Sequence, residues 1–207
     1  MTTKEKLLAL LEDSKGTFFS GEEIARTLQV SRAAVWKAVN ALREDGYTID
    51  AVTNKGYRLS PDSDILSPQG IRRFLKPEYR DLNLTVLPTA PSTNALVREK
   101  ANQGCPEGCV IIACEQTAGR GRYGRQFFSP ADTGVYLSLL LRPTAYSPQQ
   151  ATCLTAAAAA AMCQAIEAVT GQHPGIKWVN DIFLHGKKVC GILTEAAVGL
   201  ETGTLNY

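Results

Sequence analysis

Residues 20–46 read SGEEIARTLQVSRAAVWKAVNALREDG, and this stretch decides the fold of the N-terminal part. Ser20 followed by Glu23 predicts a capping box that opens a short helix. After a short turn, the hydroxyl of Ser31 is placed to cap a second helix. That helix carries apolar residues at helical spacing, and Gly46 is suited to end it. The stretch therefore predicts two helices joined by a tight turn.

The flanking sequence completes a small domain. A leucine-rich segment at 7–11 has one apolar stripe at helical spacing and predicts a preceding helix. The strand-like runs 47–52 and 57–59 are separated by turn-forming residues. Three helices followed by a hairpin predict a winged helix-turn-helix over residues 1–60. The polar, proline-containing segment 61–65 predicts a linker.

This arrangement indicates binding to duplex DNA, because the second helix of such a pair can lie in the major groove. The candidate DNA-binding residues are Ser31, Arg32, Lys37, Lys55 and Arg58. A helical module that docks other proteins is the alternative. Trp36 lies at or beyond the margin of the apolar stripe. Contact with DNA and packing against the hairpin both remain open for this residue.

The composition is that of a folded chain with 44% hydrophobic and 20% charged residues among 207. A net charge of +2 is too small to indicate a nucleic-acid partner, so any DNA contact must come from a local patch. The N-terminus does not read as a signal peptide, and the apolar run at 156–162 is too short to span a bilayer. We therefore expect a cytoplasmic protein with no membrane contact.

Metal binding by a cysteine cluster is not expected. The chain has six cysteines and two histidines, and no two cysteines form a C-x-x-C pair. We expect Cys114, Cys153, Cys163 and Cys190 to be small buried residues in a reducing compartment.

Residues 66–207 predict a second domain of the α+β class around one sheet. Helices are expected after Ser92 and over 149–170, where small alanine side chains suit close packing on a sheet. Strands are expected at 84–87, 110–113, 135–141, 176–178, 182–184 and 188–194. The run 135–141 is mostly apolar, which is consistent with burial on both faces.

A loop rich in arginine and glycine carries the clearest chemistry. Residues 115–125 read EQTAGRGRYGR and lie between two apolar strands. Glycines let backbone N–H groups approach an anion closely, and arginines donate bidentate hydrogen bonds to carboxylate or phosphate. No Gly-Lys-Ser/Thr follows, so the segment is not a P-loop. An Arg-Gly element that binds nucleic acid is the alternative, although a site loop on a rigid scaffold is favoured.

Two further segments are candidate parts of a site. Lys177 stands between apolar residues, where a cation is stable only if an anion compensates it. Asn180 and Asp181 can orient a nucleotide or magnesium. Ser92, Thr93 and Asn94 can bind a polar, urea-like ligand. For Lys177, Asn180 and Asp181, the alternative is a surface lysine beside an Asn-Asp turn. For Ser92, Thr93 and Asn94, the alternative is a plain helix cap.

Together these segments closely resemble the bifunctional biotin–protein ligase and biotin-operon repressor family over nearly the whole chain. The resemblance rests on residues 31–37, 92–94, 116, 119–124, 128–130, 177–181 and 187–195. It implies a winged helix-turn-helix followed by a mixed-sheet catalytic domain like that of biotin and lipoate ligases. It also implies that biotin and magnesium–ATP form biotinyl-5′-AMP. The biotin then passes to a lysine of the biotin carboxyl carrier protein of acetyl-CoA carboxylase.

The resemblance further implies the roles of individual residues and partners. Lys177 and Arg122 are implied as catalytic residues. The implied biotin- and adenylate-binding residues are Ser92, Thr93, Asn94, Gln116, Gly119, Arg120, Gly121, Arg122, Lys177, Asn180 and Asp181. Operator DNA is implied as a partner of the first domain, with a homodimer forming when ligand is bound.

The chain departs from the family pattern in three places. Val179 stands where the family usually has proline, and Phe127-Phe128 replaces a stretch that typically contains tryptophan. Family members normally continue past the position of Tyr207, so we expect a catalytic domain that is incomplete at its C-terminus. The alternatives are a ligand-sensing DNA-binding regulator without ligase activity and a lipoate ligase. The arginine-glycine loop and the DNA-binding domain disfavour the lipoate ligase.

Overall fold

The computed structural model describes residues 1–143, 151–198 and 205–206. It consists of two compact units, Met1–Asp81 and Leu82–Tyr207.

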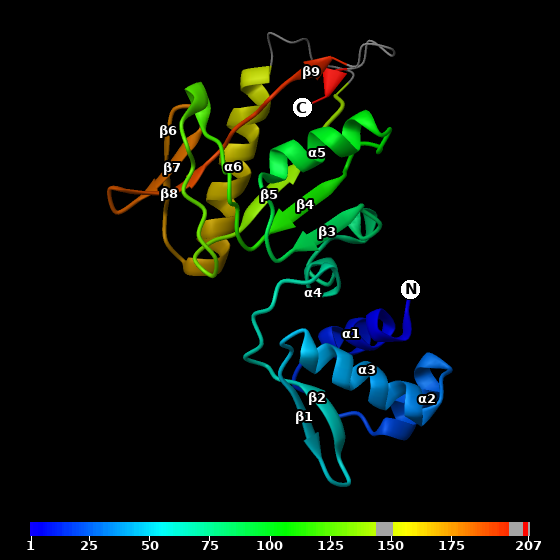
Figure 1. Ribbon diagram of the computed structural model, residues 1–207. Helices are drawn as coiled ribbons and strands as arrows, with labels where there is room; N and C mark the ends of the chain where they lie inside the picture. Colours follow the sequence, from blue (N-terminus) through cyan, green and yellow to red (C-terminus); the bar gives the residue numbers. More distant parts are fainter. Residues whose placement is uncertain (144–150, 199–204, 207) are drawn as a thin grey trace. The chain divides into compact units, whose positions relative to one another are not determined.

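The first unit has the winged helix-turn-helix order that the sequence predicts. Helices α1 (Thr3–Asp13), α2 (Gly21–Leu28) and α3 (Arg32–Glu44) precede an antiparallel hairpin of β1 (Ile49–Val52) and β2 (Gly56–Leu59) (Figure 1). The sharp turn between α2 and α3 is made by Gln29, whose φ is 56°.

The caps of these helices differ in one respect from the prediction. The Ser20 hydroxyl accepts a hydrogen bond from the Glu23 backbone N–H at 3.0 Å, but the described structure lacks the return bond of a capping box. The complete box lies at the start of α1, between Thr2 and Glu5. The Ser31 hydroxyl caps α3 by accepting from the Ala34 N–H at 3.2 Å.

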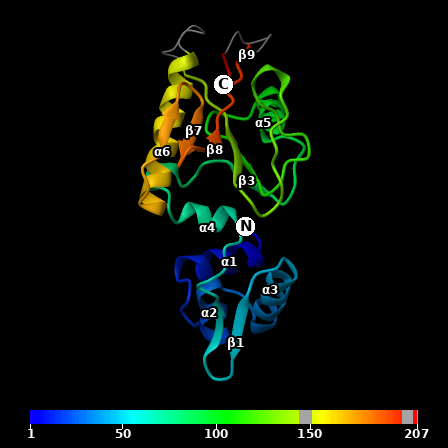
Figure 2. The ribbon, with the colours of Figure 1, turned by 90° about the vertical axis from the view of Figure 1, so that its left-hand side faces the viewer.

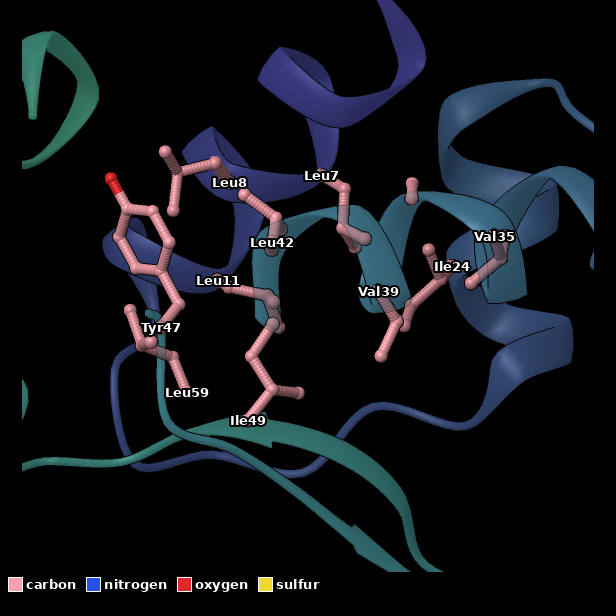
Figure 3. Packing of buried hydrophobic residues seen from close by; sticks show 11 residues of the cluster. Leu7, Leu8, Leu11, Ile24, Val35, Val39, Leu42, Tyr47, Ile49 and Leu59 are labelled. Carbon is pink, nitrogen blue, oxygen red and sulfur yellow. The ribbon is translucent and has the colours of Figure 1, made fainter. Parts of the chain in front are cut away.

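The core of the first unit joins all three helices to the hairpin. Figure 3 shows apolar side chains from each element pointing into one cluster. Leu7, Leu11, Ile24, Val39, Leu42 and Leu59 are at most 1% exposed. Burying one such side chain contributes about 1.5–3 kcal/mol. The apolar residues at helical spacing in the sequence therefore form the core of this unit.

The segment after the hairpin belongs to the first unit rather than the second. Helix α4 (Pro68–Arg72) packs against α1, and a 3-10 turn follows at Pro77–Tyr79. Ser67 caps α4 through the Gly70 N–H at 2.9 Å, and the buried Glu12 lies 3.6 Å from Arg73. We expected the second domain to start at residue 66. The packing of α4 on α1 and the Glu12–Arg73 pair instead hold the segment to the helical unit.

The second unit contains two three-stranded sheets, whereas the sequence predicted one. In the first sheet, β4 (Val110–Ala113) pairs in parallel with β3 (Leu84–Leu87) and antiparallel with β5 (Tyr136–Leu139). Helix α5 (Thr93–Asn102) packs against β4 and β5, with Val97 in the shared core (Figure 1). This is the mixed sheet that the family resemblance implies.

The second sheet is an antiparallel meander of β6 (Gly175–Lys177), β7 (Asp181–Leu184) and β8 (Lys187–Gly191). Helix α6 (Ala151–Thr170) lies beside it (Figure 2). The short strands β9 (Ala197–Val198) and β10 (Leu205–Asn206) form a separate pair. Tight connections such as the His185-Gly186 turn keep β6–β8 together. No ladder among the described residues joins them to β3–β5.

Two expectations about apolar segments are wrong. Strand β5 is not buried on both faces, since Leu137 and Leu139 are 50% and 41% exposed. Helix α6 is not closely packed by its alanines, most of which are exposed, although Ala159 is buried. By length and composition, Cys153–Thr170 can cross a membrane, which the shorter run in the sequence did not suggest. In the structure this helix contacts β6 and β7 and belongs to the second unit.

Candidate functional site

The N-terminus of α5 supplies one polar wall of the site. The backbone N–H and the hydroxyl of Thr93 both donate to Gln116 Oε1, at 2.9 and 3.1 Å. The Gln116 amide in turn donates to Ser129 Oγ at 3.0 Å. Ser92 and Thr93 are 5% and 3% exposed, so this wall is largely shielded from water. Such a network fixes its polar groups in place before a ligand arrives.

Asn94 extends this wall toward the C-terminal part of the unit. The Ser138 hydroxyl contacts both Thr93 Oγ1, at 2.8 Å, and Asn94 Oδ1. The Asn94 amide nitrogen donates to Glu195 Oε2 at 2.9 Å, and Arg98 pairs with Glu195 at 2.7 Å. The amide of Asn94 is therefore held in one orientation from several sides.

The arginine-glycine loop supplies a cationic rim. It contains a 3-10 turn at Arg122–Gly124 and is closed by a bridge between Arg120 and Gln126. Arg122 donates to Asn180 Oδ1 at 3.0 Å and to the Tyr123 hydroxyl at 3.2 Å. The guanidinium of Arg122 thus links the loop to the turn between β6 and β7.

The acidic group beside this rim does not fit a magnesium ion. Asp181 Oδ1 accepts from the Asn180 amide at 3.0 Å and pairs with Lys188 at 2.8 Å. No group of three or more His, Cys, Asp or Glu residues suitable for a metal is present among the described residues. Because Mg²⁺ prefers oxygen ligands in a near-octahedral set, one carboxylate already paired with a lysine is a poor site. Asn180 instead accepts a hydrogen bond from Arg122, and Asp181 pairs with Lys188.

The polar wall and the cationic rim line one cavity of about 910 Å³. Its apolar lining comes from β5, α6 and β8. Among the lining residues are Ser92, Thr93, Asn94, Gln116, Arg120, Gly121, Arg122, Leu137, Ser138, Leu139, Leu154, Met162, Asn180, Lys188, Ile192 and Glu195. The cavity therefore offers hydrogen-bonding groups, an apolar middle and cations.

Three of the candidate site residues do not line this cavity. Gly119 is buried at the base of the loop, and Asp181 is linked to the cavity through Asn180 and Lys188. Lys177 is exposed, and its ammonium lies 5.5 Å from the centre of the Phe183 ring. Because β6 leaves Lys177 on the surface, the structure does not bring it together with the other implied site residues in the cavity.

The cysteines differ in their environments. Of the four cysteines expected to be buried, Cys153 is exposed and the other three, Cys114, Cys163 and Cys190, are only half-buried, so the expectation of full burial is wrong. Cys109 is buried. Cys190 lines the cavity, and burial raises the pKa of its thiol. The neutral thiol is therefore favoured, and Cys190 acts as part of the apolar lining rather than as a nucleophile.

A second candidate site lies on the first unit. Arg32 and Lys37 are exposed on α3. Trp36 is 58% exposed and does not belong to the apolar cluster. The exposed α3 face has the geometry of a helix that can enter the major groove.

The hairpin adds cations around an aromatic ring that sequence reasoning missed. The Arg58 guanidinium and the Lys55 ammonium lie 4.5 and 5.9 Å from the centre of the Phe18 ring. Arg58 also pairs with Asp50 at 2.7 Å, so part of its charge is already compensated. Lys55 is the more available of the two for a phosphate.

Comparison with known proteins identifies the second unit. The model of the biotin/lipoate A/B protein ligase family matches residues 86–203, more than half of the chain. The chain belongs to the biotin/lipoate A/B protein ligase family. A helix-turn-helix domain model matches residues 3–58, in agreement with the fold of the first unit.

Relatives with both parts are known in this family. The bifunctional ligase/repressor BirA of Bacillus spizizenii is 43% identical over 194 residues, which are 94% of this chain and 59% of that protein. BirA of Escherichia coli is 34% identical over 194 residues, covering 94% and 58%. The solved biotin protein ligase of Aquifex aeolicus with biotin and ATP is 30% identical, with a TM-score of 0.45, and covers 60% and 49%. The chain thus spans less than two thirds of these relatives' length.

Within the ligase-family unit, the structure adds side chains that were not among the predicted site residues, although three of them lie in the segments 128–130 and 187–195 that carry the resemblance. They are Arg98, Ser129, Ser138, Lys188 and Glu195. Ser138 carried a signal, because it is the single polar residue in the apolar run Leu137–Leu141. Arg98 had none, since its role depends on Glu195, which is 97 residues away in sequence.

Proposed function

We propose that the protein is an ATP-dependent biotin–[biotin carboxyl carrier protein] ligase that also represses transcription by binding operator DNA. The observation that carries the ligase activity is the meeting of a polar wall, an apolar middle and an arginine rim in one cavity. Biotin has the complementary parts, namely a polar ureido ring, an apolar body and a carboxylate. Membership of the ligase family and similarity to BirA support this assignment.

The proposed first step is adenylation. An oxygen of the biotin carboxylate attacks the α-phosphorus of ATP, and the bond to the pyrophosphate breaks. Negative charge grows on the reacting oxygens, and fixed cations stabilise such charge more in the transition state than in the ground state. The position of Arg122 in the cavity lining and its hydrogen bond to Asn180 support it for this role.

In the proposed second step, the amine of an acceptor lysine attacks the carbonyl carbon of biotinyl-5′-AMP. An amide forms, AMP leaves and the amine loses a proton. We propose the carrier protein of acetyl-CoA carboxylase as the source of that lysine. Magnesium would accompany ATP through its phosphates, and we assign it no protein ligands or step of its own.

We propose Arg122 and Lys177 as charge donors in adenylation, and two substitutions separate their roles. Arg122→Met is expected to slow adenylate formation by about 100-fold, the scale of losing one oriented donor. Lys177→Met has the same expected effect only if binding of biotin and ATP turns β6 toward the cavity. Single-turnover pyrophosphate release from biotin and ATP measures both.

Arg125→Met is the matched control, because Arg125 is exposed in the same loop and does not line the cavity. Normal chemistry in Arg122→Met would remove Arg122 from the mechanism. A normal rate of adenylate formation in Lys177→Met would mean that the arginine-glycine loop alone stabilises the developing charge. Wild-type protein that binds biotin without releasing pyrophosphate would favour the regulator without ligase activity. Release with lipoate instead of biotin would favour a lipoate ligase.

For the first unit we propose operator binding through Ser31, Arg32, Lys37, Lys55 and Arg58. Arg32→Ala and Lys37→Ala are each expected to weaken binding and to reduce the salt slope by about one unit, because each loses one phosphate contact. Titration of duplex DNA at several salt concentrations measures this. Unchanged slopes in both variants would contradict the proposed surface.

We further propose a cytoplasmic protein that pairs into a homodimer when biotinyl-5′-AMP is bound, so that two copies read two half-sites. One chain carrying a DNA-binding unit and a metabolite site supports this coupling. Sedimentation of the protein with and without biotin and ATP, alongside the same DNA titrations, tests it. Equal association and equal DNA affinity in both conditions would contradict the coupling.

A further inference from the structure

Trp36 is a large aromatic side chain left on the surface of α3. It is 58% exposed, although its neighbour Val35 is 1% exposed. Its indole N–H has no hydrogen-bond partner among the residues that the structure describes. Tryptophan commonly uses its apolar body and its single donor together at interfaces. The exposed position of Trp36 therefore indicates a binding partner outside the first unit.

The residues around Trp36 indicate the charge of that partner. Helical geometry places Arg32, Ala33 and Asn40 beside it, and Lys37 is the next residue along the helix; Arg32 and Lys37 are exposed. The only carboxylate of α3 is Glu44, eight residues further on, or about 12 Å along the helix axis. An aromatic ring with cations near it, and with the helix's only carboxylate at the far end, is complementary to a polyanion. It is less suited to a protein surface of mixed charge.

We infer that Trp36 reads a thymine in the major groove. This inference rests on the proposed DNA binding and adds the residue that gives sequence preference. The indole carbons would pack on the C5-methyl group of thymine, and the N–H would donate to thymine O4 or a purine N7. Indole nitrogen is a donor only, so it matches these acceptors and not the amino group of cytosine. The small side chain of Ala33, one turn earlier, leaves the ring room to approach a base edge.

The role of Trp36 differs in kind from those of Arg32 and Lys37. A cation that meets a phosphate releases counterions and sets the salt slope, whereas an uncharged ring does neither. Loss of Trp36 should therefore reduce the ratio of specific to non-specific affinity and leave the salt slope unchanged. This pair of readouts separates base reading from a phosphate contact.

The first experiment uses the full chain and a pool of duplexes with a randomised central segment. Sequences bound by wild-type protein are selected, and Trp36→Ala is then tested on the selected duplex and on an unselected one. The selected duplex should lose affinity by about 5- to 100-fold, as for one mismatched base pair, while the unselected duplex changes little. Trp36→Phe keeps an aromatic ring but lacks the N–H donor. Its affinity for the selected duplex should therefore lie between those of the wild type and Trp36→Ala.

The second experiment tests the thymine methyl group directly. Each thymine of the selected site is replaced in turn by deoxyuridine, which lacks only the C5-methyl. One replacement per half-site should weaken wild-type binding about fourfold, the scale of one buried methyl group. The same replacement should have no effect on Trp36→Ala. The chain has two tryptophans, so a Trp178→Phe background allows the fluorescence of Trp36 alone to report the contact.

Each outcome has a definite reading. Unchanged sequence preference in Trp36→Ala, or a methyl effect that persists in it, would overturn the inference while leaving DNA binding by the first unit intact. A change in oligomeric state with normal DNA binding would make Trp36 a protein contact and would also overturn it. Wild-type protein that binds no duplex even at low salt would remove the proposed DNA function itself.

Discussion

Replacing Gly56 by alanine is expected to disrupt the hairpin of the first unit and to abolish DNA binding. Gly56 has a φ of +96°, and an added Cβ would lie 2.0 Å from the Phe19 carbonyl oxygen and 2.6 Å from Ser20 Cα. Both neighbours are backbone atoms, so neither can rotate away. That carbonyl also accepts the Tyr57 N–H at 2.8 Å, which is one of three backbone bonds tying the segment before α2 to β2.

The expected loss combines overpacking and a strained backbone, about 2–5 kcal/mol in total. For a unit of this size, each kcal/mol lowers the melting temperature by about 4–8 °C. Gly46→Ala is the matched control. Gly46 has a φ of +94°, but an added Cβ would meet only Ile65 Cδ1 at 3.7 Å. Melting curves of the two variants should differ clearly. Equal shifts would show that the close approach at Gly56 is relieved at little cost.

Replacing Gly119 by alanine is expected to lower biotin affinity by about 100-fold, or about 2.7 kcal/mol. A Cβ at this position would lie 2.5 Å from the Phe127 carbonyl oxygen and 2.7 Å from Ser129 Oγ. The Phe127 carbonyl is backbone, so the two sides of the arginine-glycine loop must separate. Movement of Ser129 would release Gln116 and hence Thr93, and the polar wall of the cavity would lose its fixed geometry.

Calorimetry with biotin measures this effect, and Gly175→Ala is the control. An added Cβ at Gly175, at the exposed start of β6, would meet no atom within 4 Å. Biotin affinity should therefore stay at the wild-type level in Gly175→Ala. Biotin binding by Gly119→Ala that matches the wild type would show that the wall around Gln116 is not part of the biotin site.

Local sequence signals determined most of the secondary structure. The helix-turn-helix followed from apolar residues at helical spacing and from the serine cap at Ser31, because both signals act within a few residues. The strand Val110–Ala113 and the turn at His185-Gly186 are as predicted for the same reason. The boundary between the two units could not be predicted from such local signals. It depends on Glu12 and Arg73, which are far apart in sequence and meet only when α4 packs on α1.

The elements of the candidate site could be predicted from residue type and order alone: a small polar triplet, an arginine-glycine loop and a Lys-Trp-x-Asn-Asp segment, in the family's order. Which of these residues meet depends on the tertiary structure. Thr93, Gln116 and Arg122 line one cavity, while Lys177 stays on the surface. Likewise, Ser138 and Glu195 enter the site through hydrogen bonds to residues dozens of positions away. The physical reason is that residue type and local spacing are properties of short segments. Convergence in a cavity depends instead on how strands pair and how helices pack.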